Sequence, residues 1–177
     1  GDVTTFQLFP NQKFVPCLAA SEGVTPTVTA VVKRGRLNDR LKLYLRNFKS
    51  GLNFDLFTVE RSSQLANGAP DPAFRGFGLA WYQSDIQVNT DDDYEGEPSK
   101  VEIKTILLDQ IFGFDPDVGL APTNTFHVGF WFNDPNDATP CGFDVTRPTP
   151  FNGDHRAGPL AFISRPVEAT DLKSFSV

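Results

Sequence analysis

The chain lacks Met altogether and has only two His and two Cys among its 177 residues. Metal sites built from His and Cys need three or four such ligands, and the H-E-x-x-H spacing of zinc hydrolases is absent. The G-x-S-x-G motif of serine hydrolases, phosphate-binding loops and dinucleotide fingerprints are absent as well. We therefore identify no catalytic residue from the sequence, which disfavours an enzyme.

The formal net charge is −6, and acidic residues gather near positions 91–97. A nucleic-acid partner is therefore not expected, because such surfaces gather basic side chains. No apolar run approaches the roughly 20 residues that a membrane-spanning helix needs. Because the chain begins at Gly1 and contains no Met, we expect its natural N-terminus to have been removed. The absence of N-x-[ST] sequons disfavours a eukaryotic secretory origin.

What the chain does contain is 14 Gly, 14 Pro and 17 Phe. So many turn-forming residues predict short strands rather than long helices. A chain of this length buries a sizeable core as one unit, whereas two separate domains would each be marginal. We expect one domain over residues 1–177.

Alternation of apolar and polar residues predicts the strands. Residues 40–46 place Leu41, Leu43 and Leu45 on one side, and residues 27–33 alternate in the same way. The Gly, Asn and Asp between these two segments favour an antiparallel hairpin. Other strands are predicted at 52–59, 77–88, 101–105, 126–132 and 160–163, whereas 106–114 suits either a buried strand or a short helix. In the segment 77–88 the apolar phase switches, which predicts a β-bulge near Gln83 and Ser84.

About nine short strands favour a two-sheet antiparallel Greek-key β-sandwich, with a jelly roll as the near alternative. Residues 45–59 resemble the strand–corner–strand motif of fibronectin-like sandwiches, although the corner Pro is missing and Phe54 replaces the usual Tyr. Together with residues 77–85, this segment is similar to uncharacterised secreted bacterial β-sandwich proteins. The resemblance covers about a quarter of the chain and implies a fold and export, not an activity.

Cys17 and Cys141 are 124 residues apart, which is too far for a C-x-x-C metal pair. We expect a disulfide rather than two buried thiols, and therefore a compartment outside the reducing cytosol. The predicted localisation is secreted or extracytoplasmic.

One acidic stretch resembles a calcium-binding loop. Counting Asp91 as position 1 places Asp93 at 3, Glu95 at 5, a Gly at 6 and Glu102 at 12. Glu at position 5 and the strand-like flanks depart from the pattern of an EF-hand. Calcium is thus the one cofactor considered, and a solvated hairpin tip whose charges discourage edge pairing is the favoured alternative.

The aromatic residues Trp81, Tyr82 and Trp131 suit either core packing or a platform on which a sugar ring stacks. The phase switch makes Tyr82 the one most expected to face outward. His127 shares the Trp131 face of its strand and is expected to pack or hydrogen-bond across strands. His155 is expected in a loop with an ion partner.

These observations predict a non-catalytic secreted or cell-envelope module that binds an unknown protein or glycan, with loops around Asp91 and Asn133 as one interaction surface. A carbohydrate-binding module is the first alternative. A hydrolase is the second, and it would need His127 or His155 near a carboxylate.

Overall fold

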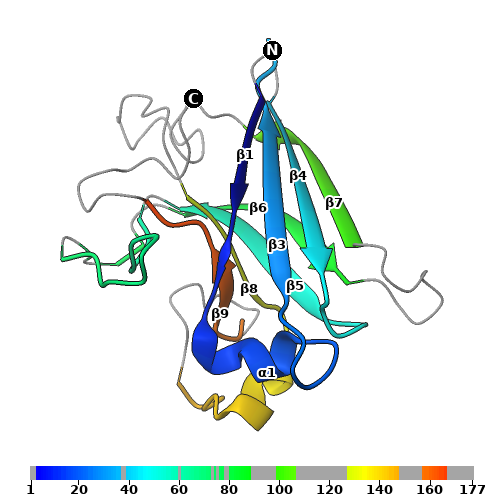
Figure 1. Ribbon diagram of the computed structural model, residues 1–177, viewed down its shortest axis with the longest axis vertical. Coiled ribbons are helices and arrows are strands. Elements are labelled where there is room, and N and C mark those ends of the chain that lie inside the picture. The colour runs from blue at the N-terminus through cyan, green and yellow to red at the C-terminus, as the bar shows by residue number, and fades with distance from the viewer. Residues whose placement is uncertain are drawn as a thin grey trace.

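The computed structural model describes residues 3–36, 39–59, 61–72, 74, 76–77, 80–88, 99–106, 127–147 and 157–166. At Trp81 and at residues 100–106 only the backbone is described. Figure 1 shows the elements, which in chain order are β1 (Val3–Gln7), β2 (Phe9–Pro10), η1 (Gln12–Phe14), α1 (Val15–Leu18), β3 (Thr27–Lys33), β4 (Asp39–Arg46), β5 (Asn53–Val59), β6 (Ala80–Gln87), β7 (Ser99–Ile106), β8 (His127–Phe132), η2 (Pro135–Cys141) and β9 (Leu160–Ile163).

The strands form two antiparallel sheets packed face to face, so the predicted β-sandwich is confirmed. The four-stranded sheet has the order β1-β3-β4-β7, and the five-stranded sheet has the order β2-β9-β8-β5-β6. Within the described chain, β4 pairs with β7 in one sheet while β5 pairs with β8 in the other. Successive strands thus cross between the sheets, as they do in immunoglobulin-like and fibronectin-like sandwiches.

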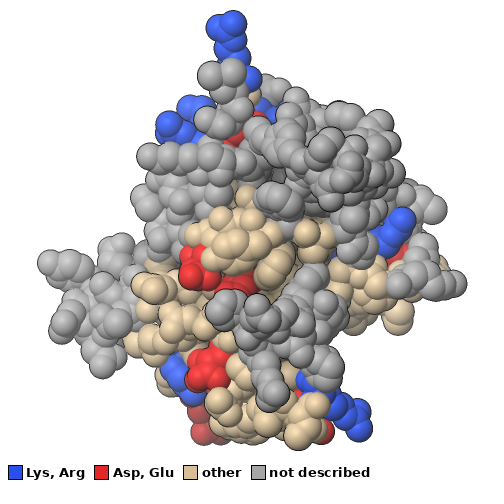
Figure 2. Space-filling view, turned by 180° about the vertical axis from the view of Figure 1, so that it is seen from behind, with Lys and Arg blue, Asp and Glu red and all other residues tan. Residues whose placement is uncertain are grey.

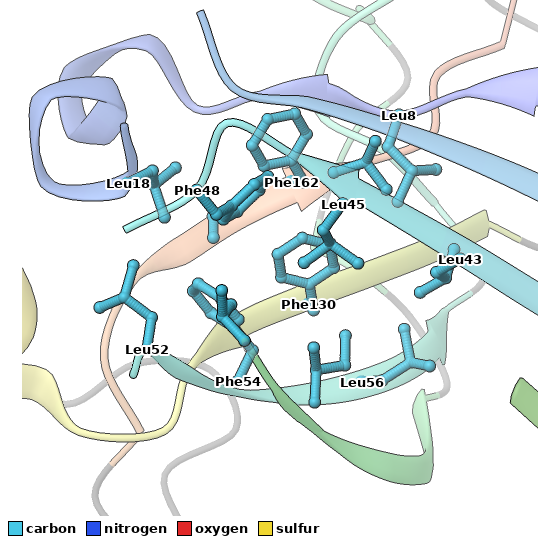
Figure 3. Packing of buried hydrophobic residues seen from close by; sticks show 14 of the residues in the cluster. Leu8, Leu18, Leu43, Leu45, Phe48, Leu52, Phe54, Leu56, Phe130 and Phe162 are labelled. Carbon is cyan, nitrogen blue, oxygen red and sulfur yellow. The ribbon is translucent and has the colours of Figure 1, made fainter. Parts of the chain in front are cut away.

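The core lies between the sheets because each strand turns one row of alternating side chains inward. From the four-stranded sheet come Leu41, Leu43 and Leu45 together with the apolar row of β3, all at most 2% exposed. The five-stranded sheet contributes mainly phenylalanines, and in Figure 3 the rings of Phe130 and Phe162 lie beside Leu45. Phe54 and Phe130 have ring centroids 4.8 Å apart, and Phe130 stacks on Phe162 at 5.6 Å.

The connection from β4 to β5 is a corner at which the chain passes from one sheet to the other. Asn47 adopts a left-handed backbone conformation with φ of 62°, and its side-chain amide donates to the carbonyl of Thr25. Phe48 then turns into the core, where its ring lies 5.9 Å from that of Phe54. At this corner the apolar ring of Phe54 packs within the core, at a position where fibronectin-like domains place a tyrosine.

The predicted β-bulge is confirmed in β6. Leu56 of β5 pairs with Ser84, whereas the next residue, Phe57, pairs with Tyr82. Gln83 is therefore the extra residue on the bulged strand. The bulge shifts the alternation, so Ile86 faces the core while Tyr82 lies opposite Phe57 on the outer face.

The N-terminal strands β1 and β2 lie in a region where no element is predicted. β1 pairs with β3, and the short β2 pairs with β9, so one N-terminal segment borders both sheets. No residue of β1 is buried, because this strand lies at an edge of its sheet. The helices of the described segments are short, and none is long and apolar enough to cross a membrane.

The predicted disulfide is present and joins Cys17 of α1 to Cys141 at the end of η2. It ties the N-terminal segment to the region that follows β8, with a Cα–Cα distance of 6.2 Å. Phe14 supports this junction, since its ring makes edge contacts with Phe132 and Phe143.

Replacing both Cys17 and Cys141 with Ser is expected to lower the free energy of unfolding by about 4 to 5 kcal/mol, because the disulfide closes a long loop in the unfolded chain. Urea unfolding of oxidised wild type and of the double variant measures this difference. Reductant is expected to destabilise the wild type and to leave the variant unchanged. Equal stability of the two proteins would contradict the structural role of the bridge.

Candidate functional site

The outer face of the five-stranded sheet carries a second group of aromatic side chains, separate from the core. Three aromatic side chains meet there: Trp131 of β8, Phe57 of β5, and Phe77, which precedes β6 in the chain. The Trp131 ring is 5.6 Å from the ring of Phe57 and 5.3 Å from that of Phe77, with edge-to-face geometry in both cases. This layer buries Trp131 almost completely, at 1% exposure.

Tyr82 forms the exposed end of this aromatic layer. Its ring makes an edge contact with Phe57 at 5.7 Å, yet the residue remains 49% exposed. Its hydroxyl donates a 2.6 Å hydrogen bond to the Oδ1 atom of Asp85, three residues along the same strand. The ring therefore has a hydrogen-bonded orientation while much of its surface stays open to solvent.

Asp55 lies directly across from Asp85 in the β5–β6 register. Facing carboxylates in an antiparallel pair repel one another, so such an arrangement needs compensating hydrogen bonds. Asn133 supplies one of them, because its side-chain amide donates to the Oδ1 atom of Asp55 at 2.9 Å. The hydroxyl of Tyr82 supplies another by donating to Asp85.

We call these five residues the outer-face patch: Asp55, Phe57, Tyr82, Asp85 and Asn133. In Figure 2, which views the molecule from behind, acidic side chains lie among uncharged ones near the middle of the face. The patch combines an open aromatic ring with carboxylate oxygens that accept hydrogen bonds and an amide that donates them. Such a combination recognises hydroxyl-bearing ligands.

Burial raises the pKa of Tyr82 to about 12, and the hydrogen bond to Asp85 together with the negative charges of Asp85 and Asp55 acts in the same direction. Each effect disfavours the phenolate, because ionisation would place a third negative charge beside two carboxylates and would break the hydroxyl donation.

Two of the other predicted ligand-facing residues, Trp131 and His127, are buried. Trp131 is buried in the aromatic layer, and the side chain of Trp81 lies outside the described part of the chain. His127 is 1% exposed, and its Nδ1 atom lies 3.4 Å from the hydroxyl of Ser164. That hydroxyl accepts the backbone N–H of Val128, so the cross-strand hydrogen-bonding role expected for His127 fits its position.

Most of the predicted calcium loop lies outside the described residues. Asp91, Asp93 and Glu95 lie outside the described residues, whereas the backbone at Glu102 belongs to β7, paired with Lys42. His155 also lies outside the described residues. Within the described segments, no three His, Cys, Asp or Glu side chains come together to hold a metal ion. The calcium site stays a prediction.

Sequence reasoning identified Tyr82 and Asn133 but missed Asp55, Asp85 and Phe57. Asp55 interrupts an otherwise apolar segment between Phe54 and Leu56, which is a visible signal of an outward position. Its partner could not be found in the same way, because the bulge at Gln83 determines which residue of β6 faces it.

No family model, curated protein or solved structure matches the chain.

Replacing Asp85 with Asn is expected to lower the pKa of Tyr82 from about 12 toward the ordinary value near 10, because a charge and a strong acceptor are lost. Ultraviolet absorbance of tyrosinate, titrated against pH, measures the change. The Tyr82→Phe variant identifies the Tyr82 step, since the chain contains three tyrosines. A Tyr82 step near pH 10 in the wild type would contradict the assigned environment.

Because the pKa of Tyr82 is raised in the folded protein, the free energy of unfolding depends on pH in the alkaline range. Because the folded-state pKa exceeds the unfolded one, the contribution of Tyr82 is fully present below about pH 10 and is lost as the pH rises toward 12. Urea unfolding across this window should show a smaller loss of stability in Tyr82→Phe than in the wild type.

Proposed function

We propose that this protein is a non-catalytic extracytoplasmic binding module that holds its ligand against the outer-face patch. The observation that carries this proposal is the half-exposed ring of Tyr82, held by a hydrogen bond to Asp85 beside the partly buried Phe57 and the buried Trp131. A tyrosine that served packing alone would have little need of an oriented, solvent-exposed face. A ligand could stack on the exposed ring and form hydrogen bonds with the flanking polar groups at the same time.

The compartment is inferred from the disulfide. Bridges such as Cys17–Cys141 persist where the surroundings are oxidising and are rare in the cytosol. The similarity of the segments 45–59 and 77–85 to secreted bacterial β-sandwich proteins points in the same direction. Secretion or attachment to the cell envelope therefore belongs to the proposal.

A neutral glycan is the ligand class that the patch favours. Sugar rings present apolar C–H faces that stack on aromatic side chains, and their hydroxyls donate to carboxylates. Tyr82 offers the ring and the exposed Asp85 offers acceptor oxygens, while the exposed Asn133 is held beside them by its hydrogen bond to the buried Asp55.

A hydrolase that acts on glycans is the second candidate. Asp55 and Asp85 face each other across β5 and β6, and paired carboxylates are the catalytic groups of most glycosidases. Binding and cleavage are distinguishable, because a binding module leaves the chain length of its oligosaccharide unchanged.

The test is a titration of isotope-labelled protein with neutral hexasaccharides of glucose, xylose and N-acetylglucosamine, followed by nuclear magnetic resonance. Binding of one of them should shift the amide resonances of β5, β6 and Asn133. The Tyr82→Ala variant should bind at least about fivefold more weakly, since stacking on one aromatic side chain is worth roughly 1 kcal/mol or more.

A matched control is Tyr44→Ala, which removes a tyrosine from the other sheet. The proposal predicts that this variant binds the hexasaccharide as the wild type does. Shortened products after prolonged incubation would instead support the hydrolase. Absence of any shift with all three sugars would remove the neutral glycan as ligand.

A further inference from the structure

The outer face of the four-stranded sheet differs in charge from the outer-face patch. It is formed by alternate residues of β1, β3 and β4, which pair in continuous register. Its described side chains are basic or uncharged: Val3, Thr5, Gln7, Thr27, Thr29, Val31, Lys33, Arg40, Lys42, Tyr44 and Arg46. A chain with a formal net charge of −6 thus carries one face without a described acidic side chain.

We call Lys33, Arg40, Lys42 and Arg46 the basic row. Lys33 lies directly opposite Arg40 in the β3–β4 register, and Arg46 lies opposite Thr27. Like charges at facing positions destabilise a sheet. The ion pairs in the described part of the chain are Arg34–Asp39 and Arg147–Asp144, so none neutralises the basic row there.

The fourth strand, β7, is described at these positions by its backbone, which pairs Glu102 with Lys42 and Lys100 with Tyr44. Arg40 and Arg46 have their β3 partners in Lys33 and Thr27, neither of which is acidic.

We propose that the basic row binds a linear acidic polysaccharide that runs along β4. Outward residues of a strand recur about every 7 Å, so the row from Arg40 to Arg46 extends over about 20 Å in a straight line. Three of the four outward residues of β4 are cations, and the fourth is the half-buried Tyr44. A polymer with carboxylate or sulfate groups repeated along its length matches this spacing of charges.

Other anionic partners fit this face less well. Single-stranded nucleic acid is held by several stacking aromatics, whereas Tyr44 is the one aromatic residue on the described part of this face. A membrane surface calls for an apolar side to insert, and the exposed rows of β1 and β3 are mainly Thr, Gln and Lys. Thr27 beside β4 is exposed and instead offers a hydroxyl, which suits the hydroxyl-rich backbone of a sugar polymer, whereas the hydroxyl of Thr29 is hydrogen-bonded to the side-chain amide of Gln7.

The experiment measures the affinity of the full chain for polygalacturonate and dextran sulfate, with neutral dextran as the uncharged reference. Single-stranded DNA and vesicles containing phosphatidylglycerol are tested in parallel. The variant Arg40→Gln, Lys42→Gln, Arg46→Gln changes three exposed or half-exposed cations. Its control, Lys13→Gln, Lys49→Gln, Arg147→Gln, removes the same charge from exposed positions outside the basic row.

The wild type and the control variant should bind an acidic polysaccharide equally, and the basic-row variant should bind about 100-fold more weakly, at roughly fivefold per cation lost near a polyanion. Affinity should fall steeply as salt rises from about 20 mM to about 500 mM. Amide shifts in the wild type, confined to β3, β4 and β7, provide a readout that needs no variant.

Binding that is equal in both variants would overturn the proposal, as would no binding to either acidic polysaccharide at low salt. Tighter binding to DNA or to the vesicles would also overturn it and would assign the face to that partner. The outcome is separate from that of the neutral-glycan titration, because the two sites share no residue and lie on different sheets.

Discussion

The burial of phenylalanine and leucine rows between the two sheets is the constraint on which the rest of this structure depends. Once Phe54, Phe130 and Phe162 face inward, the strict alternation of a strand sends their neighbours to the opposite side. Trp131, Asp55 and Phe57 are outward for this reason alone. The composition of both outer faces is thus a consequence of how the core is filled.

The β-bulge at Gln83 modifies this constraint at one place, and the outer-face patch depends on it. If β6 ran through Gln83 as a regular strand with no bulge, Tyr82 would share the phase of Ser84 and Ile86 and would point between the sheets. With it, the tyrosine lies opposite Phe57 and reaches Asp85 with its hydroxyl. Bulges are frequent next to functional sites because they redirect a side chain while the sheet on either side continues.

Elements with a strong periodic signal could be predicted from the sequence, and those formed by tertiary contacts could not. The strands 27–33 and 160–163 have the predicted bounds, and the bulge follows from a change of apolar phase. β1 has no alternating apolar row, because an edge strand packs little of its surface. The facing of Asp55 and Asp85 is a matter of register between two strands, which no local pattern encodes. Tyr82 was predictable as outward, but its partners were not.

Inward aromatic residues hold the sheets together, whereas the outward Tyr82 keeps about half of its surface open to solvent. A direct test compares the free energies of unfolding of Phe130→Ala and Tyr82→Ala by urea denaturation. The account predicts a loss of about 3 to 5 kcal/mol for Phe130, which leaves a cavity between the sheets, and less than about 1 kcal/mol for the half-exposed Tyr82. Similar losses at the two positions would contradict it, since Tyr82 would then be part of the core.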